Sequence, residues 1–150
     1  WPPTLRLRPT VIDRRTLSVC VVIVLVDCAL RSIWYATSQT GAIPFTPEWT
    51  IPFRRYFGVP THFLYGVLIG IVARQRAFYW TVAVGAMSAA AGAVLHWWAG
   101  QLGVYVDWGT PAAAAMVAAL SFMMYTPLAL LGTLVGHFVS AFFGSRLPLR

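Results

Sequence analysis

The chain has 150 residues, of which 59% are hydrophobic and only 10% are charged, and its mean hydropathy is +0.70. Soluble domains carry roughly a quarter charged residues. A water-soluble fold is therefore excluded, and we predict an all-α integral membrane protein. The net charge of +7 comes from arginines, with no lysine. These arginines stand at the ends of apolar segments, where they act as topology signals, so we predict no nucleic-acid partner.

Residues 1–16 are predicted to form a cytoplasmic basic arm, because prolines disfavour a helix there. The first membrane helix is predicted over residues 17–35. Asp27 lies near mid-depth in this helix, and Arg31 follows at the i+4 position on the same face, which predicts an intramembrane ion pair. Ionisable groups at this depth are costly. The pair either holds the helix against its neighbours, transfers protons, or contacts another subunit.

Two outer loops are predicted, over residues 36–57 and 100–121. The first is long and rich in proline and aromatic residues, and long loops are often functional. Together the loops and the adjoining helix end gather an outer-face cluster, which either binds a lipid headgroup, a quinone or a partner, or anchors the chain at the interface. Its members are Glu48, Trp49, Arg54, Arg55, Tyr56, Trp97, Trp98, Asp107 and Trp108.

Two apolar runs, over residues 58–73 and 77–99, are separated only by a short basic turn that contains two arginines. This pattern predicts a transmembrane helical hairpin with its turn in the cytoplasm. His62 and His96 are then expected near the outer ends of adjacent helices, where they could face one another. Two histidines from two helices can hold a haem iron or a metal. The alternative is that each ring bonds to loop carbonyls or water.

The apolar run from Thr110 to Gly144 would be about 52 Å long as one straight helix, which exceeds a hydrocarbon core of about 30 Å. We therefore predict a fourth span over residues 122–144, preceded by a short interfacial or re-entrant helix and followed by a cytoplasmic tail over 145–150. With both ends of the chain inside, eight arginines lie inside and three outside, as the positive-inside rule favours. A fifth span would weaken this bias.

Three of the predicted helices carry small residues at four-residue spacing, the pattern that lets helix backbones approach closely in a membrane. A small bundle needs fewer such faces than these, so we expect some of them to receive other chains. The residues are Gly66 and Gly70, then Gly85 and Ala89, then Gly132, Gly136 and Ser140.

No nucleophile elbow, phosphate-binding loop or metalloprotease motif is present in the sequence, and we assign neither catalytic residues nor a metal site. The favoured interpretation is a non-catalytic small polytopic subunit of a larger membrane complex, in contact with the lipid bilayer and other integral membrane subunits. Two alternatives are kept: a haem- or quinone-associated redox anchor that uses His62 and His96, and a small-solute transporter component that uses Asp27. Arginine without lysine and abundant alanine indicate a GC-rich bacterial genome, hence a plasma (inner) membrane.

Overall fold

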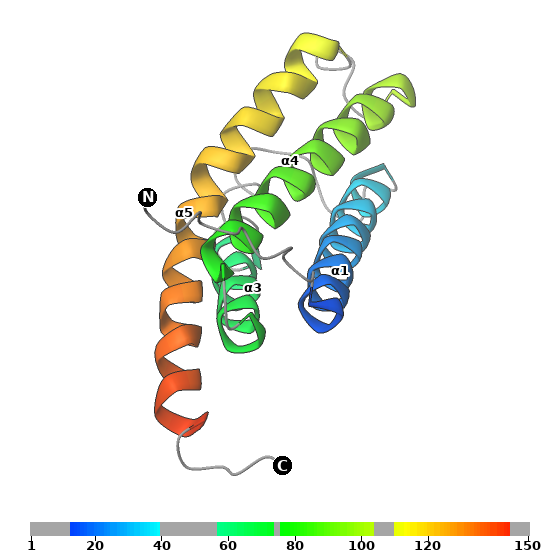
Figure 1. Cartoon of the computed structure of the whole chain (residues 1–150). Coiled ribbons are helices and arrows are strands. Elements are labelled where there is room, and N and C mark those ends of the chain that lie inside the picture. Colours follow the sequence, from blue (N-terminus) through cyan, green and yellow to red (C-terminus); the bar gives the residue numbers. More distant parts are fainter. Residues whose placement is uncertain (1–12, 40–56, 74–75, 104–109, 145–150) are drawn as a thin grey trace, which may run out of the picture.

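The computed structural model describes residues 13–39, 57–73, 76–103 and 110–144. These residues form four helices (Figure 1): α1 (Arg14–Gln39), α3 (Val59–Val72), α4 (Ala77–Gln101) and α5 (Pro111–Gly144). α1, α4 and α5 are long and apolar enough to cross a membrane, and α3 is a shorter apolar helix. The prediction of an all-helical, multi-pass membrane protein is confirmed at this level. Most of the predicted arm, the tail, and residues 40–56 and 104–109 of the two predicted outer loops lie outside the described residues.

α1 begins three residues earlier than predicted because Asp13 caps it. The Asp13 carboxylate accepts hydrogen bonds from the Thr16 hydroxyl at 2.8 Å and from the backbone N–H of Arg15 at 3.0 Å. A carboxylate at this position satisfies an N–H group that the start of a helix leaves without a partner. The hydrogen bond from Thr16, and then that from Arg15, lower the pKa of Asp13.

α5 is one continuous helix of 34 residues, so the separate short helix predicted before the last span is wrong. The alanine-rich stretch that follows Pro111 has high helix propensity, and proline at a first helical position costs no hydrogen bond. The Thr110 hydroxyl accepts a hydrogen bond from the N–H of Ala113 at 3.1 Å. Pro127 lies inside α5, and Figure 1 shows the helix changing direction between its yellow and red parts, as proline kinks do.

α3 packs chiefly on α5 rather than on α4, its neighbour in the predicted hairpin. Glycines form this contact on both sides. A Cβ atom added at Gly66 would collide with the carbonyl oxygen of Ala129, and one at Gly132 would collide with the carbonyl oxygen of Phe63. The same holds one turn further along, for Gly70 against Thr133 and Gly136 against Val67. The backbones of the two helices therefore touch, which only glycine permits.

α4 packs on the same helix through a hydroxyl pair. Thr81 and Thr133 are both fully buried, and their Oγ1 atoms lie 2.6 Å apart. Each hydroxyl also lies within hydrogen-bonding distance of a carbonyl oxygen of its own helix, that of Ala77 and that of Ala129 respectively. Since each hydroxyl has one proton, one donates to the other hydroxyl and the second donates to its own carbonyl. α1 completes the bundle and contacts mainly α4. Figure 1 shows α1 and α4 running in the same direction, with α5 on the far side of α4 and α3 beside it.

The contact of α3 and α5 through their glycines, called the glycine crossing below, predicts that the loss of stability caused by an added methyl group depends on the atoms that the methyl group meets. Gly66→Ala should destabilise the protein by about 1–3 kcal/mol, the usual effect of overpacking, because the methyl group meets the α5 backbone. Gly85→Ala should cost less, since its methyl group meets only the side chain of Thr126. Thermal unfolding of the two variants in detergent tests this order. Equal melting temperatures would contradict a backbone contact at Gly66.

Candidate functional site

The polar centre of the bundle is an ion pair in the middle of α1. The Nε–H of Arg31 donates a hydrogen bond of 2.9 Å to Oδ2 of Asp27. Asp27 is only 3% exposed and lies about 20 Å from the start of a helix about 39 Å long. A buried carboxylate this far from either end needs a partner, and Arg31 supplies it from the next turn.

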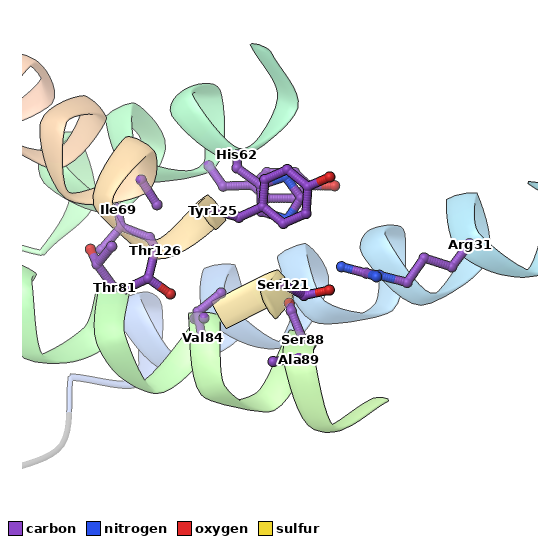
Figure 2. Close-up of a pocket in the computed structure, with 13 residues that line it drawn as sticks. Arg31, His62, Ile69, Thr81, Val84, Ser88, Ala89, Ser121, Tyr125 and Thr126 are labelled. Atoms are coloured by element: carbon purple, nitrogen blue, oxygen red, sulfur yellow. The ribbon is translucent and has the colours of Figure 1, made fainter. Parts of the chain in front are cut away.

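The Arg31 side chain reaches from α1 to α4, where Gly92 makes room for it. A Cβ atom at Gly92 would lie 2.8 Å from Nη1 of Arg31, so a larger residue would displace the guanidinium group. Figure 2 shows Arg31 extending from α1 toward Ser88 and Ser121. The arginine thus remains inside the bundle instead of reaching out to the membrane surface.

His62 on α3 faces the same carboxylate. Its Nε2 atom lies 3.7 Å from Oδ1 of Asp27, and its Nδ1 atom lies 2.6 Å from the carbonyl oxygen of Gly58. A carbonyl oxygen only accepts hydrogen bonds, so Nδ1 carries the ring proton. In the neutral ring the lone pair of Nε2 therefore points toward the carboxylate. A second proton, on Nε2 or on Oδ1, would turn this contact into a charge-assisted or neutral hydrogen bond.

Two tyrosines hold the imidazole ring of His62 in place. The Tyr125 ring is stacked on it, with 4.2 Å between the ring centroids and an angle of 12° between the planes. The Tyr65 ring meets it edge-on at 5.6 Å. Gly58 leaves the space that the Tyr125 hydroxyl needs, since a Cβ atom there would lie 3.0 Å from the hydroxyl oxygen. Figure 2 shows the overlapping rings of His62 and Tyr125.

A cavity of about 20 Å³ adjoins this cluster between the four helices. Space of this size holds about one water molecule. Three buried hydroxyl groups belong to residues on its wall, those of Tyr65, Ser88 and Thr126, and within the described part of the chain none of them has a hydrogen-bond partner. The other lining residues are Arg31, His62, Ile69, Thr81, Val84, Gly85, Ala89, Ser121, Tyr125 and Ala129.

His96 lies in a different contact from His62. Its Nδ1 atom is 3.4 Å from the hydroxyl oxygen of Tyr35 on α1, and the two rings are tilted by 57°. His62 lies beside Asp27, in the middle of α1, rather than at the outer end where the sequence-based topology puts it. The first turn of α3 lies beside Asp27 and Tyr125, in the middle of α1 and α5, instead of level with the end of α1. Of the described residues, no three His, Cys, Asp or Glu side chains gather as a metal site would require.

The predicted small-residue faces lie against parts of the same chain. Gly66 and Gly70 meet α5, Gly132 and Gly136 meet α3, and Gly85 meets Thr126. Ala89 lines the cavity. Ser140, at the far end of α5, is partly exposed.

Of the predicted outer-face cluster, only Trp97 and Trp98 belong to the described residues. Both are exposed near the end of α4. The remaining members, Glu48, Trp49, Arg54, Arg55, Tyr56, Asp107 and Trp108, lie outside the described ranges.

The sequence analysis missed the residues that surround Asp27. Tyr65 and Tyr125 look like ordinary interfacial or core aromatics in an apolar run, and their contacts with His62 depend on how α3 and α5 cross. Ser88 and Thr126 carried a signal, because each is an isolated hydroxyl in the apolar middle of a long helix.

Comparison with protein-family models, with curated proteins and with solved structures finds no match to this chain. The chemistry of the site must therefore be argued from its own geometry.

The ion pair predicts a non-additive pair of substitutions. Arg31→Gln leaves the Asp27 carboxylate buried without its cation and should destabilise the protein by about 3–5 kcal/mol. Replacing both residues, with Asp27→Asn added, removes the buried charge and should restore most of that loss. Thermal unfolding of the two variants in detergent measures the difference. If the double variant is as unstable as Arg31→Gln alone, the buried charge is not the cause.

Proposed function

We propose that this chain is the proton-binding component of a small-solute transporter, with Asp27 and His62 sharing one proton in the middle of the bundle. The observation that carries the proposal is the 3.7 Å approach of Nε2 of His62 to Oδ1 of Asp27, with the other ring nitrogen held by Gly58. A lone pair and a carboxylate oxygen that face each other have room for a proton between them. Ionisable groups inside a membrane mark such sites.

Proton binding would change the net charge of the cluster formed by Asp27, Arg31 and His62. With Asp27 ionised, Arg31 charged and His62 neutral, the cluster has no net charge. One added proton gives the cluster a charge of +1 in surroundings of low dielectric constant, where a charge interacts far more strongly than in water. The protein can offset this charge by binding an anion, releasing a cation or changing conformation. Any of these would couple the proton to a second event, as transport requires.

The interpretation as a subunit of a larger complex gains no support from the small-residue faces. That interpretation required small-residue faces that are free to receive other chains. The glycines of α3 and α5 instead contact the backbone of each other's helix within this chain. Other integral membrane subunits therefore stay a prediction without a contact surface assigned to them.

The redox alternative gains no support from His62, because both of its ring nitrogens already face protein atoms. Haem ligation would require the ring to leave Gly58 and Asp27. A quinone or haem bound through His62 and His96 together would also need the two histidines to share a site, whereas His62 contacts Asp27 and His96 contacts Tyr35.

We further propose that the protein lies in a bacterial plasma membrane with the start of α1 and the turn between α3 and α4 on the cytoplasmic side. The arginines at these positions, among them Arg14, Arg15 and Arg76, follow the positive-inside rule.

Proton uptake into proteoliposomes tests the proposed function. The purified chain is reconstituted with a pH-sensitive dye inside, and a potassium diffusion potential drives protons inward. We expect uptake by the wild type, and at least a tenfold loss, in the usual range for removing a proton-transfer group, in the Asp27→Asn, Arg31→Gln double variant and in His62→Gln.

Ser32→Ala is the matched control, because Ser32 is exposed on α1 next to Arg31. Its hydroxyl donates a hydrogen bond to the carbonyl of Cys28 in its own helix. This variant should retain the wild-type rate. The proposal is wrong if wild-type vesicles take up protons no faster than protein-free vesicles, or if the double variant matches the wild type.

A further inference from the structure

The seam between α1 and α4 is polar on one half of its length and apolar on the other. The two helices run in the same direction with a constant offset, since Tyr35 contacts His96 and Arg31 contacts Gly92, each pair 61 positions apart. By the same offset Asp27 lies level with Ser88, and Ile23 lies level with Val84. The seam is therefore apolar on one side of the level of Asp27 and polar on the other.

Toward the helix starts, the seam is closed by apolar side chains. Ile23 and Val84 belong to one buried cluster together with residues of α3. Two of these residues, Ile69 and Ala73, are each 1% exposed. The hydroxyls of Thr81 and Thr133 at this end lie within hydrogen-bonding distance of each other and of carbonyls of their own helices. The cluster also contains Tyr65, which lines the cavity at the boundary between the two halves.

Toward the helix ends, polar groups follow one another along the seam. Asp27, Arg31 and Tyr35 recur every fourth residue on α1, and therefore lie on one face. Ser88, Gly92 and His96 do the same on α4. Arg31 lies against the backbone of Gly92, and the Tyr35 hydroxyl lies beside Nδ1 of His96, so polar side chains recur along the seam from the middle of the bundle to the last turns of α4.

α3 lines only the closed half. Its first residues face Tyr125 of α5 and its last turn faces Thr133 and His137. The N-terminal part of α5 and the end of α4 therefore extend past α3, as Figure 1 shows. In the open half the described residues provide three helices instead of four.

The cavity lies where the two halves meet. Ser88 and Thr126 stand on its wall with hydroxyl groups that lack a partner among the described residues, and each side chain is more than nine-tenths buried. Buried hydroxyls in native proteins are almost always satisfied by protein or by ordered water, and the cavity has room for about one water molecule. Arg31, on the same wall, connects this position with Asp27.

We infer that water reaches Asp27 and His62 from one side of the membrane only, along the α1–α4 seam from the side on which both helices end, at Gln39 and Gln101. A proton would arrive from water on that side and bond to Nε2 of His62 or to Oδ1 of Asp27, leaving the water molecule behind. The charged and titratable groups that face His62 are Asp27 and Arg31 from α1, Tyr65 from α3 and Tyr125 from α5. The α4 side chains on the cavity wall are uncharged. The use of the path for protons rests on the proposed function, but the path itself does not.

Reaction of introduced cysteines with silver ions tests the path. Silver ions are small, do not cross lipid and react with thiols in contact with water. Ser88→Cys samples the polar half, and Ile23→Cys on α1, at a buried position of the apolar cluster that does not belong to the cavity wall, samples the apolar half. Both are made with Cys28→Ala, and the natural Cys20 in the apolar cluster is an internal control that should stay unmodified.

The reaction is measured in membrane vesicles of the two opposite orientations, in nitrate buffer, by the loss of later labelling with a fluorescent maleimide after denaturation. We expect the Ser88→Cys thiol to be modified at least ten times faster than the Ile23→Cys thiol, and only when silver is on the side of Gln39 and Gln101. Equal rates at the two positions, modification from the side of Arg14 and Arg76, or an unreactive Ser88→Cys thiol would each overturn the inference.

The labelling experiment tests the path and the proton-uptake experiment tests the proposed function, so each can be contradicted without the other. One-sided modification of the Ser88→Cys thiol without any proton uptake by the wild type would retain the path and remove the proposed function. Proton uptake that depends on Asp27, together with an unreactive thiol at position 88, would retain the function and remove the path.

Discussion

Helices inside a bilayer gain little by burying apolar surface against one another, because lipid tails are as apolar as leucine side chains; close backbone packing has to hold them together instead. In this chain that packing is the glycine crossing of α3 and α5. Carbonyl oxygens of each helix rest on the glycines of the other. A shift of α3 by one residue would bring the side chain of Val67 into the place of Gly66. The crossing therefore fixes the height of α3 as well as its distance from α5.

The height of α3 decides what His62 can touch. A helix of 14 residues is about 21 Å long, so its first turn ends up beside the middle of α1 once its glycines are in register with α5. His62 then meets Asp27 instead of the membrane surface. Each of the two groups is oriented separately, His62 by the carbonyl oxygen of Gly58 and Asp27 by Arg31. The contact between Asp27 and His62 is thus assembled from two helices whose relative position depends on a third.

The sequence indicates the local features of this structure well. Apolar runs mark the helices, and the i+4 spacing of Asp27 and Arg31 follows from the geometry of one helix. Features that depend on pairing between helices could not be read in the same way. Glycine faces on different helices look alike in sequence, so that nothing there says whether Gly66 meets α5 or another chain. The height of His62 was misjudged because each apolar run was taken to cross the whole membrane from one surface to the other.

The continuous α5 helix was misjudged for a related reason. A run of 35 residues is too long for one perpendicular span, but a helix can continue beyond the hydrocarbon boundary. Alanine propensity and the cap at Thr110 continue it, and Pro127 bends it without ending it. The additional turns of α5 are those that extend past α3 and carry Ser121 to the wall of the cavity.

The closed and open halves of the α1–α4 seam have the same origin. Further turns at the start of α3 would cover the open half, while the glycine crossing would keep His62 beside Asp27. A shorter α3 would lose Ile69 or its neighbours from the apolar cluster that closes the other half. The glycine crossing thus places His62 beside Asp27, and the short α3 covers only one side of the proposed proton site. A proton carrier must bind its proton from one side at a time, and under the proposed function this structure would be the state open to one side. The proposal then requires a second state, in which the apolar contact of Ile23 with the α3 and α4 cluster opens.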